Sequence, residues 1–241
     1  MLPIRDVNPT RIRPLVTWTI IAVNAIVYFG WQPQDVDAAT EFVYERAAIA
    51  CELTTGAPLS LDEINTGRCS DGPEQPFFQG KNVWLSALVS MFLHGSIAHI
   101  LFNMWSLWIF GNNVEEAFGH LGYLLFYLAA GVAATVGFVV VNPELTVPLV
   151  GASGAIAGMM GAYLVLFPSH QVMSLVLFRI VAIPAILFLG IWFLSQFFFS
   201  SEGVAWEAHV AGFAFGALLA LPFRRLLLRR TLAGERHSSA W

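Results

Sequence analysis

Charged residues are scarce in this sequence. Lys, Arg, Asp and Glu make up 12% of its 241 residues, whereas 57% are hydrophobic and the mean hydropathy is +0.67. Soluble domains typically carry about twice that charged fraction. The composition therefore excludes an ordinary soluble domain. It predicts a single membrane domain over residues 1–241, with apolar runs long enough to cross a bilayer several times.

Two further absences narrow the chemistry. No Asp lies in any long apolar stretch, which excludes a paired-aspartate site and a conventional Ser-His-Asp triad within the membrane. No H-E-x-x-H motif occurs, so that zinc ligand set is missing. We expect neither a metal nor another cofactor. Cysteine is scarce too, and for Cys51 and Cys69 a disulfide and two free thiols are equally open.

Six apolar stretches of roughly helix-spanning length are present, each bounded by polar, Gly or Pro residues. They predict an all-α membrane protein, a bundle of six transmembrane helices with a long extracytoplasmic first loop. A shorter apolar segment, Trp84–Leu93, is expected to form an interfacial or re-entrant helix, or to lengthen the second span. The stretches are Leu15–Trp31, Ile97–Glu115, Leu121–Val141, Gly154–Phe167, Arg179–Phe199 and Ala205–Phe223.

Basic residues gather at both ends of the chain, before the first span and after the last. The first loop is acidic instead. The positive-inside rule therefore places both termini in the cytoplasm, as an even number of spans requires. We expect a cytoplasmic segment at 1–14, an extracytoplasmic or interfacial loop at 32–96 and a cytoplasmic tail at 224–241. The arginine-rich tail is more consistent with contact to anionic lipid than with nucleic-acid binding.

The polar residues inside the spans cluster. His94 and His99 flank the start of span two, with Asn103 four residues further on, Ser153 begins span four, and His209 lies near the start of span six. With the N-terminus inside, each even-numbered span enters from the extracytoplasmic side. All of these residues therefore lie at similar depth in the same half of the membrane, where costly polar groups indicate function.

Span four is short. Its 14 residues from Gly154 to Phe167, before Pro168, make roughly 21 Å of helix, and the hydrocarbon core is about 30 Å thick. If Pro168 reaches the cytoplasmic face, Ser153 lies below the outer surface. The preceding loop must then dip inward, which is tolerated only where it is buried or lines a wet cavity.

A serine at a helix start beneath a cavity suits amide hydrolysis. Ser153 can act as nucleophile, and its own backbone N–H lacks an intrahelical partner and can donate to an oxyanion. His209 can act as general base and acid. The side chains of His99 and Asn103, at positions i and i+4, can point at the same oxygen.

Glycines offer a way to bring Ser153 and His209 together. Gly212 and Gly216 share a helix face with His209, and span four carries a similar stripe, so the two helices can pack closely. The expected packing glycines are Gly151, Gly154, Gly158, Gly212 and Gly216. Each signal alone has a structural reading. The serine and the histidine can be packing residues or hydrogen-bonders, and glycine stripes also suit a channel or transporter.

The motifs nevertheless form an ordered set. His94-Gly-Ser-Ile-Ala-His99-Ile-Leu-Phe-Asn103, Gly151-Ala-Ser153-Gly154 and Ala208-His209-Val-Ala-Gly212 resemble the signature set of the rhomboid family of intramembrane serine proteases. The resemblance covers nearly all of Leu15–Phe223. It implies a Ser–His dyad in a water-filled cavity, oxyanion donors at His99 and Asn103, and a surrounding polar network that includes His94.

Three functional readings follow. The resemblance implies an endopeptidase that cuts membrane-spanning proteins near the membrane boundary, with substrate access past span five and the next loop, Ile191–Gly203. The alternative is a catalytically silent rhomboid-like protein that binds transmembrane clients. A small transporter or channel would instead require repeated halves, which the sequence lacks. Where some family members carry an aromatic residue four positions after the serine, this chain has Ala157, so the support of His209 is open.

Overall fold

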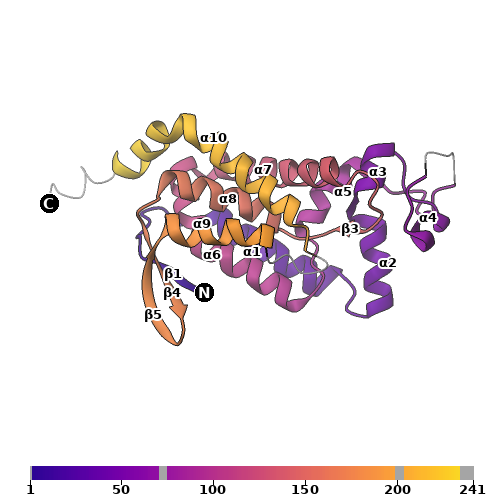
Figure 1. Cartoon of the computed structure of the whole chain (residues 1–241), viewed down its shortest axis with the longest axis horizontal. Coiled ribbons are helices and arrows are strands. Elements are labelled where there is room, and N and C mark those ends of the chain that lie inside the picture. The colour runs from indigo at the N-terminus through magenta and orange to yellow at the C-terminus, as the bar shows by residue number, and fades with distance from the viewer. Residues whose placement is uncertain (1, 71–74, 199–203, 234–241) are drawn as a thin grey trace.

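The structure, a computed structural model, describes residues 2–70, 75–198 and 204–233, with side chains up to residue 229. Helices dominate it (Figure 1). The helices of the first loop are short, and those of the bundle are longer. The helices are α1 (Leu15–Ile26, continued by a π-helical turn at Val27–Trp31), α2 (Val36–Arg46), α3 (Ala50–Thr55), α4 (Leu61–Thr66), α5 (Val83–Val89, followed by a 3-10 turn at Ser90–Phe92), α6 (Ile97–Phe118), α7 (His120–Val141), α8 (Ser153–Leu166), α9 (Ala185–Phe198) and α10 (Trp206–Ala233).

Each of the six expected apolar stretches overlaps one of these helices, and α10 continues to Ala233, ten residues beyond its stretch. Two of them, α7 and the Trp206–Arg229 part of α10, are long and apolar enough to cross a membrane, with mean hydropathies of 2.4 and 1.5. A third span results if α5 and α6 are counted as one unit, bent by 79° at the break between them. The remaining apolar helices, α1 with its π-helical turn, α8 and α9, are shorter. Trp84–Leu93 lies mainly in α5, as the expected interfacial or re-entrant helix.

The expectation of an all-α chain is wrong in two places. Strands β4 (Gln171–Val176) and β5 (Arg179–Pro184) form a hairpin, and β1 (Leu2–Asp6) pairs with β4. The fifth stretch, expected to be helical from Arg179, becomes helical only at Ala185. Residues that precede proline disfavour helical backbone, and branched residues such as Ile180 and Val181 favour strands. A second, two-residue pairing joins β2 (Ala48–Ile49) to β3 (Pro148–Leu149).

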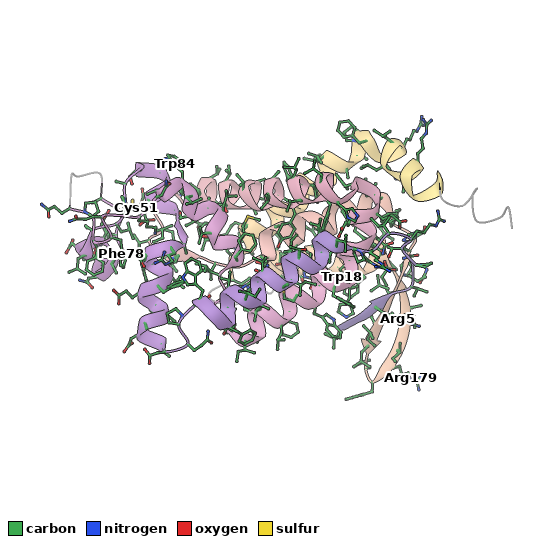
Figure 2. All side chains as sticks on the ribbon, turned by 180° about the vertical axis from the view of Figure 1, so that it is seen from behind. Arg5, Trp18, Cys51, Phe78, Trp84 and Arg179 are labelled. Atoms are coloured by element: carbon green, nitrogen blue, oxygen red, sulfur yellow. A yellow bond between two sulfur atoms is a disulfide. The ribbon has the colours of Figure 1, made fainter. Side chains whose placement is uncertain are left out.

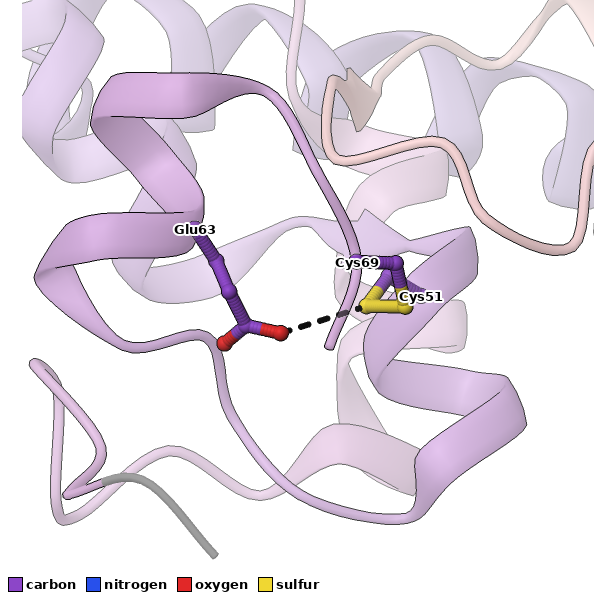
Figure 3. Close-up of side chains that lie close together, drawn as sticks. All are labelled: Cys51, Glu63 and Cys69. Carbon is purple, nitrogen blue, oxygen red and sulfur yellow. Dashed lines mark hydrogen bonds between the residues drawn. A yellow bond between two sulfur atoms is a disulfide. The ribbon is translucent and has the colours of Figure 1, made fainter. Parts of the chain in front are cut away.

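The first loop folds around two cross-links, one covalent and one ionic. Cys51 and Cys69 form a disulfide, with their Cα atoms 5.7 Å apart, which answers the question that the sequence left open. The Glu63 carboxylate lies beside it (Figure 3), 3.8 Å from the Cys51 sulfur. The buried Lys81 ammonium pairs with Glu52 at 2.5 Å. Burial raises the pKa of the Glu52 carboxyl and lowers the pKa of the Lys81 ammonium, because desolvation penalises both charged forms.

The two ends of the molecule differ in character. Cys51, Phe78 and Trp84 lie at one end, and Arg5 and Arg179 lie at the other (Figure 2). At the second end, the fully buried Glu115 of α6 accepts hydrogen bonds from the backbone N–H groups of Val16 and Thr17 at the start of α1. The Thr17 hydroxyl donates to the same carboxylate. Glu115 thus caps α1 from another helix and cross-links the two.

Helix α8 forms the centre of the bundle. All of its residues from Gly154 to Tyr163 are buried, among them Met159 and Tyr163. It packs against α6, α7, α9 and α10. A 14-residue helix surrounded on so many sides holds the position of its first residue, Ser153, firmly.

Candidate active site

Ser153 and His209 meet although 56 residues separate them in the chain. The Ser153 Oγ lies 2.8 Å from the His209 Nε2, within hydrogen-bond range. Ser153 is the first residue of α8, and His209 lies in the first turn of α10. Both side chains are partly buried. A hydroxyl paired with an imidazole nitrogen in this way is the arrangement that nucleophilic catalysis requires.

Glycine contacts bring the two helices this close. A Cβ atom added to Gly212 or to Gly216 would lie far inside contact distance of the carbonyl oxygens of Gly154 and Gly158, respectively. A Cβ on Gly158 would lie 3.1 Å from the Gly212 oxygen, and one on Gly154 would lie 2.5 Å from the Ala134 Cβ on α7. The backbones of α8 and α10 therefore touch directly, as the two glycine stripes predict.

Gly151 differs from that expectation. It precedes α8 and takes no part in the contact between helices. Its φ of +123° is a conformation that side-chain-bearing residues rarely adopt, and a Cβ there would lie 2.7 Å from the His99 ring. Its N–H donates to the Ser90 carbonyl. Gly151 thus shapes the loop that leads the chain into Ser153 beside His99.

The side chains of His99 and Asn103 come from α6. That helix starts at Ile97 because the Ser96 side chain accepts a hydrogen bond from the His99 N–H and caps it. The Asn103 Nδ2 is buried and has no hydrogen-bond partner among the described residues. A buried donor without a partner is costly, so it is available to an acceptor that enters the site.

His94 is fully buried, and its side chain makes ring contacts. The ring packs edge-on against His99, with centroids 5.0 Å apart, and against Tyr28 at 6.3 Å. Neither ring nitrogen has a hydrogen-bond partner among the described residues. The backbone of His94 is held instead by the Gln32 side chain, which donates to its carbonyl and accepts from its N–H. In the structure, His94 therefore supports the His99 ring by packing.

A cavity of about 1130 Å³ joins these groups. Its lining comes from α6, α7, α8, α9 and α10, from the turn after α5 and from the loop before α8. It includes His99, Asn103, Ser153 and His209. This volume exceeds that of most small-molecule pockets, which run to about 1,000 Å³, so it has room for a segment of polypeptide.

Two neighbours of His209, both on α9, were not predicted from the sequence. The Gln196 Oε1 lies 2.8 Å from the His209 Nδ1. The ring of Trp192 lies 6.1 Å from the His209 ring, tilted by 38°. The signal that could have identified Gln196 is its polarity within an apolar stretch. Ser153 and His209 occupy the expected place, whereas residues 199–203 of the expected access loop lie outside the described part.

A separate group, Cys51, Glu63 and Cys69, has the residue types of a metal site. Their ligand atoms lie within 4.8 Å of one another. The two sulfurs are bonded to each other (Figure 3), so neither is a thiolate. Thiolates are the species that bind metal. The Glu63 carboxylate instead accepts hydrogen bonds from the backbone and hydroxyl of Ser70, which makes this group a structural clasp.

Comparison with known proteins identifies the family to which the site belongs. A family model described as a rhomboid domain matches residues 81–226, more than half of the chain. The matched region begins just before α5 and contains α6, α7, α8 and α9 and most of α10. It therefore includes every element that contributes to the cavity.

Several curated proteins are similar over part of their length. "Rhomboid protease GluP" of Bacillus subtilis is 36% identical over 121 residues, which are 48% of this chain and 23% of that protein. "Putative rhomboid protease YdcA" of the same organism is 37% identical over 81 residues, 34% of this chain and 40% of that protein. "Rhomboid protein 1, mitochondrial" of Saccharomyces cerevisiae is 28% identical over 148 residues, 56% and 40% respectively. The chain thus matches less than half of each relative.

Proposed function

Because this chain belongs to the rhomboid family, we propose that it is an intramembrane serine endopeptidase with a catalytic dyad of Ser153 and His209. The observation that carries the proposal is the 2.8 Å contact between the Ser153 Oγ and the His209 Nε2 at a cavity large enough for polypeptide. Two relatives named as a rhomboid protease and a putative rhomboid protease, at 36% and 37% identity, support the same proposal.

In the proposed reaction, the Ser153 Oγ attacks the carbonyl carbon of the scissile peptide bond while its proton passes to the His209 Nε2. The carbonyl oxygen becomes an oxyanion. His209 then gives the proton to the departing amine nitrogen, the C–N bond breaks, and an acyl-enzyme ester remains on Ser153. A water molecule attacks this ester, with His209 again taking and returning a proton, which releases the acid product and restores the hydroxyl.

Three donors are proposed for the oxyanion. The Ser153 backbone N–H has no intrahelical acceptor because it opens α8. The Asn103 amide is a buried donor without a partner among the described residues, and His99 lies beside Gly151, two residues before the serine. One such donor typically contributes about 2.7–4 kcal/mol to the transition state. His94 and the packing glycines hold this geometry without touching the substrate.

The proposed setting is a multi-pass protein of a bacterial-type plasma membrane, with one domain of six spans. Residues 1–14 and 224–241 face the cytoplasm, and residues 32–96 face the outside. A disulfide in that first loop fits an oxidising compartment. The proposed substrates are transmembrane proteins cut in or near their membrane segments. The lipid bilayer is the other partner, and no nucleic acid is involved.

Cleavage of a transmembrane model substrate by the purified protein in detergent tests the proposal. We expect Ser153→Ala and His209→Ala each to abolish cleavage, and a fluorophosphonate probe to label Ser153 in the unmodified protein. Asn103→Ala should retain measurable activity, lowered about 100- to 1000-fold.

Cleavage that survives Ser153→Ala would refute the dyad. Binding of transmembrane clients with neither cleavage nor labelling would point instead to a catalytically silent rhomboid-like protein. A chelator should leave the rate unchanged, since no step involves a metal.

A further inference from the structure

The histidine of a Ser–His pair needs a partner for its second ring nitrogen. That partner decides which nitrogen carries the proton, and so whether the other can accept the serine proton. In triads the partner is a carboxylate. Among the described residues no carboxylate bonds to His209, and Glu207 in the same helix accepts instead from Asn142.

Gln196 occupies this place. Its Oε1 lies 2.8 Å from the His209 Nδ1, and the Nε2 on the opposite side of the ring lies 2.8 Å from the Ser153 Oγ. The three side chains form one line from α9 through α10 to α8. Gln196 therefore has the position that a carboxylate holds in a triad, with a neutral amide in its place.

The rest of the amide fixes which of its atoms faces the ring. The Gln196 Nε2 donates to the Trp192 carbonyl at 3.1 Å, one turn earlier in the same helix, and also reaches the Ser195 Oγ at 3.3 Å. A reversed amide would set its oxygen against the Trp192 carbonyl oxygen, and the two would repel. The oxygen is thus directed at His209, where it can only accept. The Nδ1 must carry the proton, and the Nε2 is left to accept from Ser153.

A neutral acceptor suits the surroundings. A carboxylate in an apolar helix costs several kcal/mol unless it is paired, whereas an amide carries no charge. Helix α9 contains no charged residue. Among the described residues around His209, the titratable side chain that interacts with it electrostatically is His99 of α6.

We propose that Gln196 is a positioning residue that holds His209 in the tautomer able to take the Ser153 proton. It does so through the Oε1–Nδ1 hydrogen bond, with the Trp192 ring beside the imidazole. This inference rests on the proposed protease function. It also explains how His209 is held when position 157, one turn into α8, is a buried alanine.

Helix α9 also makes this support conditional. The buried residues of α9 are Ala185, Phe188 and Leu189, all in its first half. Gln196 lies in the second half, which has no fully buried residue. Ring contacts hold this half against α10, Phe193 to Phe213 at 4.7 Å and Phe197 to Trp206 at 5.6 Å. The orientation of His209 therefore depends on the contact between α9 and α10.

Two substitutions separate positioning from packing. Gln196→Met keeps the size and removes the acceptor, so kcat should fall about tenfold or more, the factor that corresponds to one lost hydrogen bond, while KM stays within about twofold. Gln196→Glu restores the acceptor with a negative charge that favours imidazolium. Its activity should recover at high pH, with the acid limb of the kcat profile displaced upward. Leu194→Met, on the same helix and exposed, serves as the control and should match the wild type.

A spectroscopic measurement tests the role of Gln196 independently of activity. In ¹⁵N spectra of the solubilised protein at neutral pH, with His209→Asn used for assignment, His209 should show a protonated Nδ1 that Gln196→Met loses. Equal kcat and an unchanged ring spectrum in Gln196→Met would overturn the inference. A wild type that neither cleaves substrate nor reacts with the fluorophosphonate probe would refute the proposed function alone. The ring spectrum would then decide the role of Gln196.

Discussion

Gly212→Ala is expected to separate the two helices that carry Ser153 and His209, the proposed dyad. The new Cβ would lie closer to the Gly154 carbonyl oxygen than 3.0 Å, a limit that real Cβ atoms essentially never cross. The obstacle is backbone, so no rotamer change relieves it, and α8 and α10 must move apart by on the order of 1 Å. The 2.8 Å contact between Ser153 and His209, less than one turn away, would then exceed hydrogen-bond range.

The size of the effect follows from two opposing contributions. Alanine gains up to about 1 kcal/mol over glycine inside a helix, whereas overpacking typically costs about 1–3 kcal/mol. Stability should therefore fall only modestly. A displacement of about 1 Å at a catalytic pair can cost about 100-fold in rate. We expect activity to fall far more than stability.

The assay compares kcat on a transmembrane model substrate with the thermal unfolding midpoint in the same detergent. Gly190→Ala is the matched control, because a Cβ there meets nothing within 4 Å. It should gain helix stability and keep wild-type activity. Gly212→Ala with kcat within threefold of the wild type would refute the argument that direct backbone contact of α8 and α10 sets the dyad distance.

Three predictions concern stability. Cys51→Ser should lower the free energy of unfolding by about 3 kcal/mol, since the disulfide closes a loop with a sequence separation of 18. Denaturant titration with and without a reductant measures this loss, and an unchanged midpoint would contradict the prediction. Lys81→Met should lower the free energy of unfolding by about 3–5 kcal/mol because it leaves the Glu52 carboxylate buried and unpaired. Adding Glu52→Gln should recover most of this loss. A double-mutant cycle that shows no coupling between the two positions would disprove the prediction. Glu115→Gln should lower the free energy of unfolding by about 1–3 kcal/mol because the amide cannot accept from all the N–H and hydroxyl donors at the start of α1. Hydrogen exchange at the start of α1 should accelerate, and unchanged exchange would count against the cap.

The sequence predicted the main helices and the identity of the Ser–His pair. Long apolar runs with clear boundaries leave few alternatives in a bilayer, because backbone polar groups must be satisfied within each segment. Ser96 and Gly119 mark the limits of α6, and the glycine stripes predicted the contact between α8 and α10. The six-span count and the orientation of the termini stay predictions that rest on composition.

The local sequence pattern was not sufficient to predict the hairpin of β4 and β5. The run from Arg179 is as apolar as a span, and only the pairing of β5 with β4 and of β4 with β1 made it a strand. Hydropathy does not distinguish a strand from a helix in a short apolar run. The disulfide was open for a related reason. Pairing of Cys51 with Cys69 requires their Cα atoms to approach within bonding reach, which depends on how α3 and the later loop fold together.

The support of His209 shows most clearly what the sequence determined and what the tertiary structure determined. The sequence by itself supplied the proposed nucleophile, the proposed base and the absence of any Asp in the apolar stretches that could complete a triad. Only the tertiary structure joined Gln196 to that base, because the contact spans two helices and depends on how α9 turns its polar side chain toward α10. A glutamine in an apolar run has no periodicity that marks its partner, since a hydrogen bond between helices is fixed by the packing of both.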